Sequence, residues 1–315
     1  MPKLKKIAIS IGDLNGIGVQ LALENHNTIK KSVDPIYCID KKMLEQASKL
    51  LNITIPKDFI TVETIAPYFT IEPAKVTKES GEYSFASFEN GVMLTKTEKV
   101  EGIMTLPIHK KAWEMANIEY KGHTDALRDF FMADAIMMLG CPAMYVALYT
   151  EHIPLHQVSK EVQNIKKLSS FLVDFYNAIK ENLKEDEKVA LLGLNPHAGD
   201  DGVLGDEEKS IIEATRMAHN KINREVYTQP LVPDVAFTPN SRKNYRYFVA
   251  MYHDQGLAPL KALYFDEGIN VSLNLPIKRS SVDHGTAFDI AYKGVKLNSF
   301  SYLNAVRYLK ESLSL

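Results

Sequence analysis

Cysteine and tryptophan are scarce in this sequence, and it contains no long apolar run. The two cysteines, Cys38 and Cys141, lie in apolar segments without CxxC spacing. Their positions argue against a disulfide framework or a thiolate zinc site and favour a reducing compartment, so we expect a cytoplasmic protein. No segment approaches the ~20 apolar residues of a membrane span. The apolar segment near the N-terminus has about five residues, fewer than the roughly 7–15 of a signal peptide.

An excess of charge of either sign is also missing. Lys and Arg total 37, Asp and Glu total 39, and the formal net charge is −2. This balance gives no general electrostatic reason to expect nucleic acid or an anionic membrane as a partner. Any site for an anionic ligand must therefore be local.

Two common active-site motifs are absent. The first expected strand, residues 7–11, is followed by GDLNGIG, whose glycines at 12, 16 and 18 do not have the GxGxxG spacing of a dinucleotide-binding turn. No GxSxG segment is present either, which disfavours a serine hydrolase. GDLNGIG therefore indicates only a strand-to-helix turn with a close backbone approach.

Apolar, strand-like runs alternate with amphipathic, helix-like stretches along the whole chain. This alternation predicts an α/β protein with a largely parallel sheet. The length of 315 residues favours two lobes with a cleft between them. We expect the first lobe to hold residues 1–130 and 286–315, with a helical C-terminal segment, and the second to hold residues 131–285.

Three apolar strands each run into a turn that carries a histidine. They are AMYVALYTEHIPL with His152, KVALLGLNPHAG with His197, and YRYFVAMYHDQG with His253. Residues at the carboxyl ends of parallel strands converge on one crevice, and three imidazoles with an open position are typical of a catalytic metal site. The spacing matches no short ligand motif, so the alternative is that each histidine is a turn residue bonded to a carbonyl.

A local anion site is suggested at two places. GHTD at residues 122–125 resembles the start of a helix, where free amides and the helix dipole favour phosphate or carboxylate, although taken alone it is more typical of a simple helix cap. Lys261, Lys278 and Arg279 supply positive charge within Met251–Ala287, the stretch of the chain with the highest density of reactive groups. Each could instead be a solvated surface charge.

Several of these segments together carry a family resemblance. In chain order, GDLNGIG, KGHTDAL, HIPL, GLNPHAGDDGVLGDEE, YHDQGLAPLK, GINVSLNLP and SVDHGTAFDIA resemble the 4-hydroxythreonine-4-phosphate dehydrogenase family of vitamin B6 biosynthesis, from residue 7 to about residue 293. The resemblance implies an isocitrate/isopropylmalate dehydrogenase-like fold and a homodimer with its active site at the interface. It also implies NAD or NADP and one divalent metal per subunit: zinc, magnesium or cobalt. The second lobe would carry the metal ligands and the dimer interface.

The family's functional residues can be placed on this sequence by their motifs. The metal ligands fall on His152, His197 and His253, and the substrate-binding residues on His123, Thr124, Lys261, Asn270 and Arg279. The candidate catalytic acids and bases are Lys261, Asp254 and Asp234, and His284 is the candidate cofactor contact. The sequence departs from the family pattern at Leu14, Val19, Gln20 and Asp125, which affects the first turn and leaves the metal and substrate matches intact.

The resemblance implies oxidation of 4-phosphooxy-L-threonine at C3, with a metal polarising the hydroxyl oxygen and a nicotinamide accepting hydride. The product, 2-amino-3-oxo-4-(phosphooxy)butanoate, would lose CO2 to give 3-amino-2-oxopropyl phosphate. Family relatives that oxidise D-threonate or erythronate 4-phosphate, or a cis-diol, are one alternative. Another is a metal-dependent lyase or hydrolase of a phosphorylated compound, and a third is a non-enzymatic binder of phosphorylated ligands.

Overall fold

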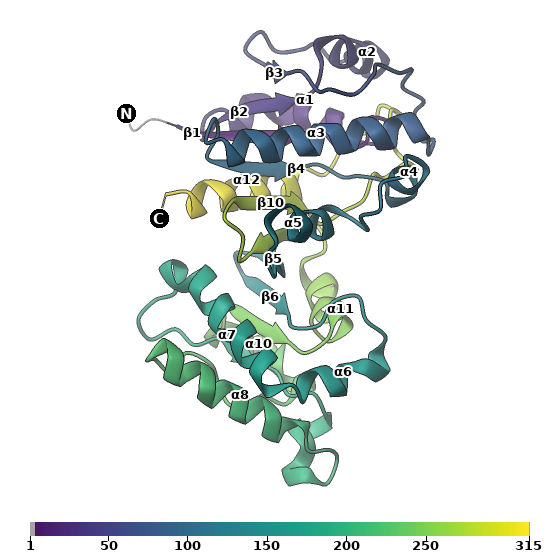
Figure 1. Cartoon of the computed structure of the whole chain (residues 1–315). Helices are drawn as coiled ribbons and strands as arrows, with labels where there is room; N and C mark the ends of the chain where they lie inside the picture. Colours follow the sequence, from purple (N-terminus) through teal and green to yellow (C-terminus); the bar gives the residue numbers. More distant parts are fainter. Residues whose placement is uncertain (1–3, 315) are drawn as a thin grey trace. The chain divides into compact units, whose positions relative to one another are not determined.

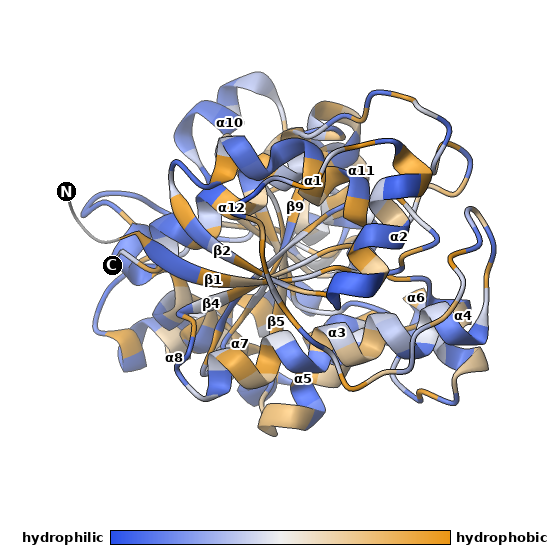
Figure 2. Cartoon of the chain, turned by 90° about the horizontal axis from the view of Figure 1, so that it is seen from above, coloured by the Kyte–Doolittle hydropathy of each residue, from blue (hydrophilic) through white to orange (hydrophobic). Residues whose placement is uncertain are grey.

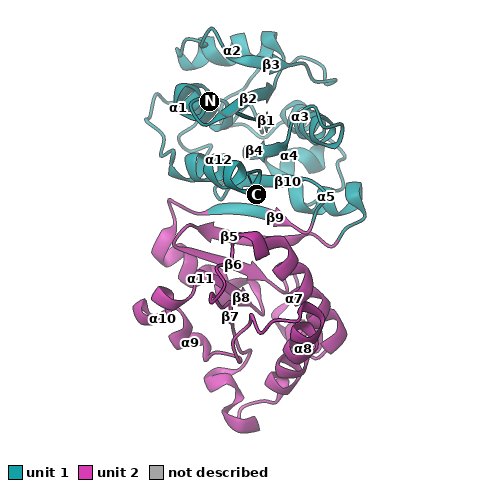
Figure 3. Cartoon of the chain, turned by 90° about the vertical axis from the view of Figure 1, so that its left-hand side faces the viewer, with its two compact units in different colours: residues 1–133, 269–271, 275–315 teal, residues 134–268, 272–274 magenta. Residues whose placement is uncertain are grey.

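The computed structural model describes residues 4–314, which form two compact units. Unit 1 comprises residues 4–133, 269–271 and 275–314, and unit 2 comprises residues 134–268 and 272–274 (Figure 3). Residues 275–285, which the sequence analysis assigns to the second lobe, lie in unit 1. The reason is that they contain a strand hydrogen-bonded to the unit 1 sheet.

Unit 1 is built on a β-sheet. The strands are β1 (Lys5–Ser10), β2 (Val33–Cys38), β3 (Ile60–Val62), β4 (Gly102–Thr105), β9 (Ile269–Leu273), of which the first three residues belong to this unit, and β10 (Lys278–Val282). Of these, β1, β2, β3, β4 and β10 run parallel. Their order is β3-β2-β1-β4-β10-β9 (Figure 3), and Figure 1 labels all of these strands except β9. β1, β4 and β10 are parallel neighbours, so their carboxyl ends lie at one edge.

Helices cover both faces of this sheet. They are α1 (Gly18–Ile29), α2 (Lys41–Leu51), α3 (Lys78–Lys96), α4 (Lys110–Met115), α5 (His123–Phe131) and α12 (Phe300–Ser312). α1 and α12 lie on one side, and α3, α4 and α5 lie on the other (Figure 3). β4 is buried along its whole length, as expected for a strand covered on both faces. The core on the α3 side contains Phe88, Trp113 and Ile103.

Unit 2 has a smaller, mixed sheet. Its strands are β5 (Ile136–Cys141), β6 (Met144–Leu148), β7 (Ala190–Leu191) and β8 (Tyr247–Ala250), in the order β5-β6-β8-β7. β6, β8 and β7 are parallel, whereas β5 and β6 form an antiparallel pair. The expectation of a largely parallel sheet misses this pair because the short turn after Cys141 joins the two strands directly, and only antiparallel neighbours can be joined in this way.

Helices of different lengths surround the unit 2 sheet. They are α6 (Leu155–Val162), α7 (Ile165–Ile179), η1 (Lys180–Asn182), η2 (Pro196–Gly202), α8 (Glu207–Ile222), α9 (Pro233–Ala236), α10 (Pro239–Asn244) and α11 (His253–Tyr264). The core residues Val146, Phe248 and Leu257 come from β6, β8 and α11. Figure 2 shows hydrophilic stretches along the outer helices and apolar residues along the strands. Among residues 4–314, no helix is long and apolar enough to cross a membrane.

The C-terminal third differs from expectation in two elements. β10 reads as polar, and α11 contains Gly256 and Pro259, so neither is evident from sequence patterning. Of the C-terminal segment expected to be helical, residues 300–312 form a helix. The α/β fold class itself is confirmed.

Candidate active site

The side chain of Arg279 is the centre of a buried polar cluster in unit 1. It lies on β10 and is only 3% exposed. Its Nη2 and Nε donate to Oγ1 of Thr105 on β4 at 2.7 and 3.1 Å, and its Nη1 donates to Oδ1 of Asn270 at 3.4 Å. Burial lowers the pKa of Arg279 to about 9, which still leaves it cationic at neutral pH. The cluster therefore holds a fixed positive charge.

His123 joins this cluster from the first residue of α5. Arg279 Nη2 lies 3.3 Å from Nδ1 of His123. A guanidinium can only donate, so Nδ1 is the acceptor and Nε2 carries the proton. Among the described residues this buried Nε2 has no hydrogen-bond partner. Burial and the Arg279 charge hold the pKa of His123 well below its ordinary value, so the ring is neutral.

The surroundings of His123 fix its ring and leave one donor available. The ring packs 4.8 Å from Phe88 and edge-on, at 5.5 Å, to Trp113. Thr124, also buried, is the next residue in the first turn of α5. The first amides of a helix and a buried N–H are suitable donors to an anionic oxygen. His123, Thr124, Arg279 and Asn270, all predicted substrate residues, therefore lie in one part of unit 1.

Two of the three predicted metal ligands lie together in unit 2. The rings of His152 and His253 have centroids 5.7 Å apart. Two imidazoles that bind one tetrahedral ion at about 2 Å would have centroids about 5 Å apart, so the pair fits a shared metal ion. Nδ1 of His253 is 2.7 Å from Oδ1 of Asp254, which leaves Nε2 directed elsewhere. A carboxylate on the second ring nitrogen is the usual support for a metal-binding histidine.

His197 is held in a different way. It begins a turn of six successive residues with positive φ, from 53° at His197 to 97° at Gly202. Across residues 4–314, no group of three or more His, Cys, Asp or Glu side chains is close enough to hold a metal ion. The structure therefore brings His152 and His253 together but does not add His197 to them within one chain.

The candidate acids and bases are spread over unit 2. Asp254 is bonded to His253 and its side chain is 84% exposed. Lys261 lies about two turns further along α11, with Nζ 5.7 Å from the ring centre of Phe265. Asp234 is exposed in the first turn of α9. Asp254 is therefore in contact with a predicted metal ligand, His253.

Two histidines lie beyond the carboxyl ends of β4 and β10 in unit 1. His284 donates from Nδ1 to the carbonyl of Gly285 at 3.0 Å, which makes Nε2 an acceptor. That Nε2 and the Nδ1 of His109, which stacks on Phe288 at 5.1 Å, are buried and lack partners among residues 4–314. Burial lowers the pKa of both rings. Sequence reasoning missed His109 and Thr105, because neither belongs to a reactive motif.

The GDLNGIG turn lies at the same edge of unit 1. Gly12 has a φ of 72°, and a side chain there would meet the carbonyl of Pro107. Ile17 donates its amide to the carbonyl of Thr286, which ties this turn to the segment of His284. Asp13 is fully buried and accepts from the Asn15 amide and the Ser80 hydroxyl, and burial raises its pKa to about 6.

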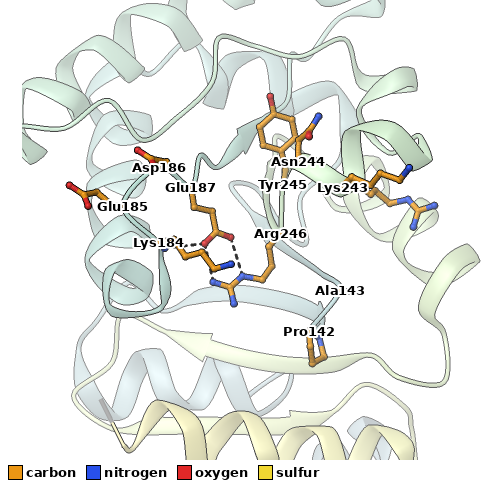
Figure 4. A pocket seen from close by; sticks show the side chains of 11 residues that line it. Pro142, Ala143, Lys184, Glu185, Asp186, Glu187, Lys243, Asn244, Tyr245 and Arg246 are labelled. Carbon is orange, nitrogen blue, oxygen red and sulfur yellow. Dashed lines mark hydrogen bonds and ion pairs between the residues drawn. The ribbon is translucent and has the colours of Figure 1, made fainter.

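A hollow of about 490 Å³ on unit 2 is a different feature (Figure 4). It is lined by residues 142–143, 184–187 and 242–246, and none of the predicted site residues is among them. Arg246 is paired with Glu187 at 3.1 Å. The hollow is therefore a charged surface feature separate from the histidine pair.

Comparison with known proteins identifies the family. The model of the family described as pyridoxal phosphate biosynthetic protein PdxA matches residues 31–309. The chain is 53% identical over 302 residues to a 4-hydroxythreonine-4-phosphate dehydrogenase of Sulfurimonas denitrificans, covering 96% of each chain. A crystal structure of the enzyme of that name from Klebsiella pneumoniae superposes with a TM-score of 0.82 at 26% identity, covering 100% of both chains.

A more distant structure supports the predicted fold class. A β-decarboxylating dehydrogenase from Thermococcus kodakarensis superposes with a TM-score of 0.53 at 13% identity, covering 99% of this chain and 84% of that one. This similarity concerns the fold alone. The family match and the extent of identity show that the chain belongs to the family of pyridoxal phosphate biosynthetic proteins PdxA.

Proposed function

We propose that this protein oxidises 4-phosphooxy-L-threonine at C3, using NAD or NADP. The observation that carries the proposal is the buried cluster of Arg279, His123 and Thr105. A cation that is 3% exposed, beside an N–H without a partner in the described chain, suits a small substrate with a phosphate or carboxylate group. Membership of the PdxA family gives that substrate its identity.

The unit 1 cluster would bind and orient the anionic end of the substrate. Arg279 would supply the charge, Nε2 of His123 a directed hydrogen bond, and the first turn of α5 with Thr124 further donors. Thr105 keeps the guanidinium plane fixed through two hydrogen bonds. Asn270 and Lys261 complete the proposed set of substrate contacts. Because Arg279, His123 and Thr105 already contact one another within unit 1, little free energy would be spent on ordering them when the substrate binds.

The reaction removes a hydride and a proton from the C3 carbinol and gives a ketone. The hydride passes to the nicotinamide, and the proton must pass to a base. Asp254 is engaged with His253, so its role would be to hold that ring. Lys261, which requires its neutral form for this task, is then our first candidate for the base, with Asp234 second. The β-keto acid loses CO2 because the adjacent ketone accepts the electron pair of the broken C–C bond.

A divalent metal bound by the imidazoles would act as a Lewis acid on the C3 oxygen. Nitrogen ligands favour zinc or cobalt over magnesium. In one chain, the rings of His152 and His253 lie within reach of a common ion, and no group of three such side chains does so among the described residues. We propose that His197 of a second copy completes the set, in a homodimer whose active site lies at the interface.

Complementation between two inactive variants tests this arrangement. A mixed dimer of a His197→Ala chain and a His253→Ala chain would contain one complete site, so mixing should restore up to half of the activity per mixed dimer. Ligands drawn from one chain alone predict no recovery. Circular dichroism of each variant serves as the control for folding.

The cofactor would lie against the carboxyl edge of β1, β4 and β10. Two features support this placement: Nε2 of His284, an acceptor without a partner among residues 4–314, and the GDLNGIG turn, which is bonded to the segment of His284. We further propose a cytoplasmic location, in keeping with the two free cysteines.

The function is tested by formation of reduced nicotinamide from 4-phosphooxy-L-threonine. We expect absorbance at the wavelength of the reduced cofactor to rise with this substrate. Activity with 4-hydroxy-L-threonine should be lower by a factor of roughly 100 or more, because the buried guanidinium would lose its anionic partner. Equal rates with both compounds, or a preference for a cis-diol, would refute the phosphorylated substrate.

A further inference from the structure

The strand ends that carry the three histidines are linked by buried hydrogen bonds. Thr150, two residues before His152, donates its hydroxyl and its amide to the carbonyl of Met251, at 2.6 and 3.2 Å. Met251 lies two residues before His253. The segments of His152 and His253 are therefore joined directly at the ends of β6 and β8.

Gln255 extends this link to the segment of His197. Its Oε1 accepts the amide of Met251 at 2.7 Å, and its Nε2 donates to the carbonyl of Gly193 at 2.7 Å. Gly193 directly follows the last residue of the apolar segment around β7 and precedes the turn of His197 by four positions. The side chain is buried, and the adjacent Gly256 lets α11 approach closely, since a Cβ there would lie 2.5 Å from Val146.

Glu208 holds the two residues that follow Gly193. Its Oε1 accepts the amides of Leu194 and Asn195, both at 2.8 Å, and its Oε2 accepts Nδ2 of Asn195 at 2.9 Å. The left-handed turn that follows is unfavourable for residues other than glycine, at about 1–2 kcal/mol each. A turn of this kind persists only where surrounding contacts stabilise it. Here the hydrogen bonds to Gly193 and Asn195 hold the residues that lead into the turn.

We propose that Gln255 is a positioning residue for metal binding: its amide fixes the segment of His197 relative to those of His152 and His253. Only a group with one acceptor and one donor can bond Met251 and Gly193 at once. The inference rests on the proposed metal-dependent function, because it presumes that these imidazoles bind an ion. In the homodimer, each Gln255 would fix the positions of two segments of its own chain. One carries His253, which binds the ion of one site, and the other carries His197, which binds the ion of the other site.

Titration with Co²⁺ tests the proposal in the protein without substrate. Gln255→Met keeps the length of the side chain and removes both hydrogen bonds. We expect its Kd for Co²⁺ to rise 10–100-fold and the visible absorption band of the bound ion to shift, as befits the loss of a group that orients ligands. Far-UV circular dichroism should stay close to that of the wild type.

Gln46 offers a matched control. In unit 1 its Nε2 donates to the carbonyl of Phe69 at 2.9 Å and its Oε1 accepts the amide of Ile71 at 2.6 Å, so it bridges two backbone groups just as Gln255 does. Gln46→Met should lower Tm by a similar amount and leave the Kd for Co²⁺ unchanged. A purely structural role for Gln255 predicts that both variants behave alike.

The possible outcomes separate this inference from the proposed function. If wild-type protein binds Co²⁺ and Gln255→Met binds it equally well, the positioning role is refuted and the metal site stands. If wild-type protein binds no Co²⁺, the metal in the proposed function is refuted. Amide hydrogen exchange then decides the linkage itself: Gln255→Met should speed exchange at Met251 and in the turn of residues 197–202, and unchanged exchange there contradicts it.

Discussion

Nη2 of Arg279 lies 3.3 Å from Nδ1 of His123, and this contact sets the chemical state of a buried histidine. The guanidinium can only donate, so the proton of the neutral ring is on Nε2. Because burial and the neighbouring charge also hold the pKa of His123 well below its ordinary value, we predict a neutral Nε2–H ring at neutral pH. Nitrogen-15 NMR of the imidazole measures this directly. An imidazolium signal at pH 7 would contradict the assignment.

Replacing Arg279 by Lys should impair substrate binding more than folding. Lys keeps the charge but cannot bond Thr105, Asn270 and His123 together, since it lacks the planar set of five donors. We expect KM for the phosphorylated substrate to rise by about 10–100-fold, equivalent to roughly 1.4–2.7 kcal/mol. The control is Arg242→Lys in unit 2, where the arginine bonds Tyr264 and the carbonyl of Phe237. A similar KM for both variants would argue against the site.

Asp13 predicts a pH dependence of stability. The carboxyl titrates near 3.9 in an unfolded chain, and burial raises its pKa to about 6 in the fold. Between these values the folded state holds the proton more tightly, so Asp13 lowers the free energy of unfolding as pH rises from about 4 to about 6. The destabilisation caused by the buried, ionised carboxylate of Asp13 is then fully present at neutral pH.

Asp13→Asn should therefore remove this decline in the free energy of unfolding, which amounts to on the order of 2 kcal/mol between pH 4 and pH 7. Urea unfolding at several pH values measures it, with Asp186→Asn at an exposed position as the control. A wild-type slope that persists in Asp13→Asn would assign the pH dependence to other groups.

His152 and His156, which lie four residues apart, provide a test of metal binding. The ring of His152 lies beside that of His253, whereas His156, within α6, has no such ring partner among the described contacts. We expect His152→Ala to weaken Co²⁺ binding by at least 100-fold and to abolish oxidation, while His156→Ala changes neither by more than twofold. Equal losses in the two variants would indicate that the whole segment is disturbed.

Much of the architecture follows from sequence patterning, but the burial of polar segments does not. β10 reads as a loop because KRSSV is polar, yet Ser280 and Ser281 donate to the carbonyls of Ala305 and Thr105, which makes their burial possible. Those partners are distant in sequence. For the same reason the helical state of α11 depends on packing that only the folded chain reveals.

Site prediction divides in the same way. Motifs predict that His123 and Arg279 bind the substrate, and the fold places the two side chains in contact. Thr105, His109 and Gln255 are not apparent from sequence alone, because their roles depend on which carbonyl or ring they meet. His197 can be found as a strand-end residue, but its left-handed turn depends on Glu208, eleven positions later.

Transfer of deuterium from C3-deuterated 4-phosphooxy-L-threonine to the nicotinamide is the most direct test of the proposed reaction. The account predicts that the label appears in the reduced cofactor, with one CO2 and one 3-amino-2-oxopropyl phosphate formed for each deuterium transferred. Release of CO2 or inorganic phosphate without reduction of the cofactor, or retention of the deuterium in the product, would contradict it.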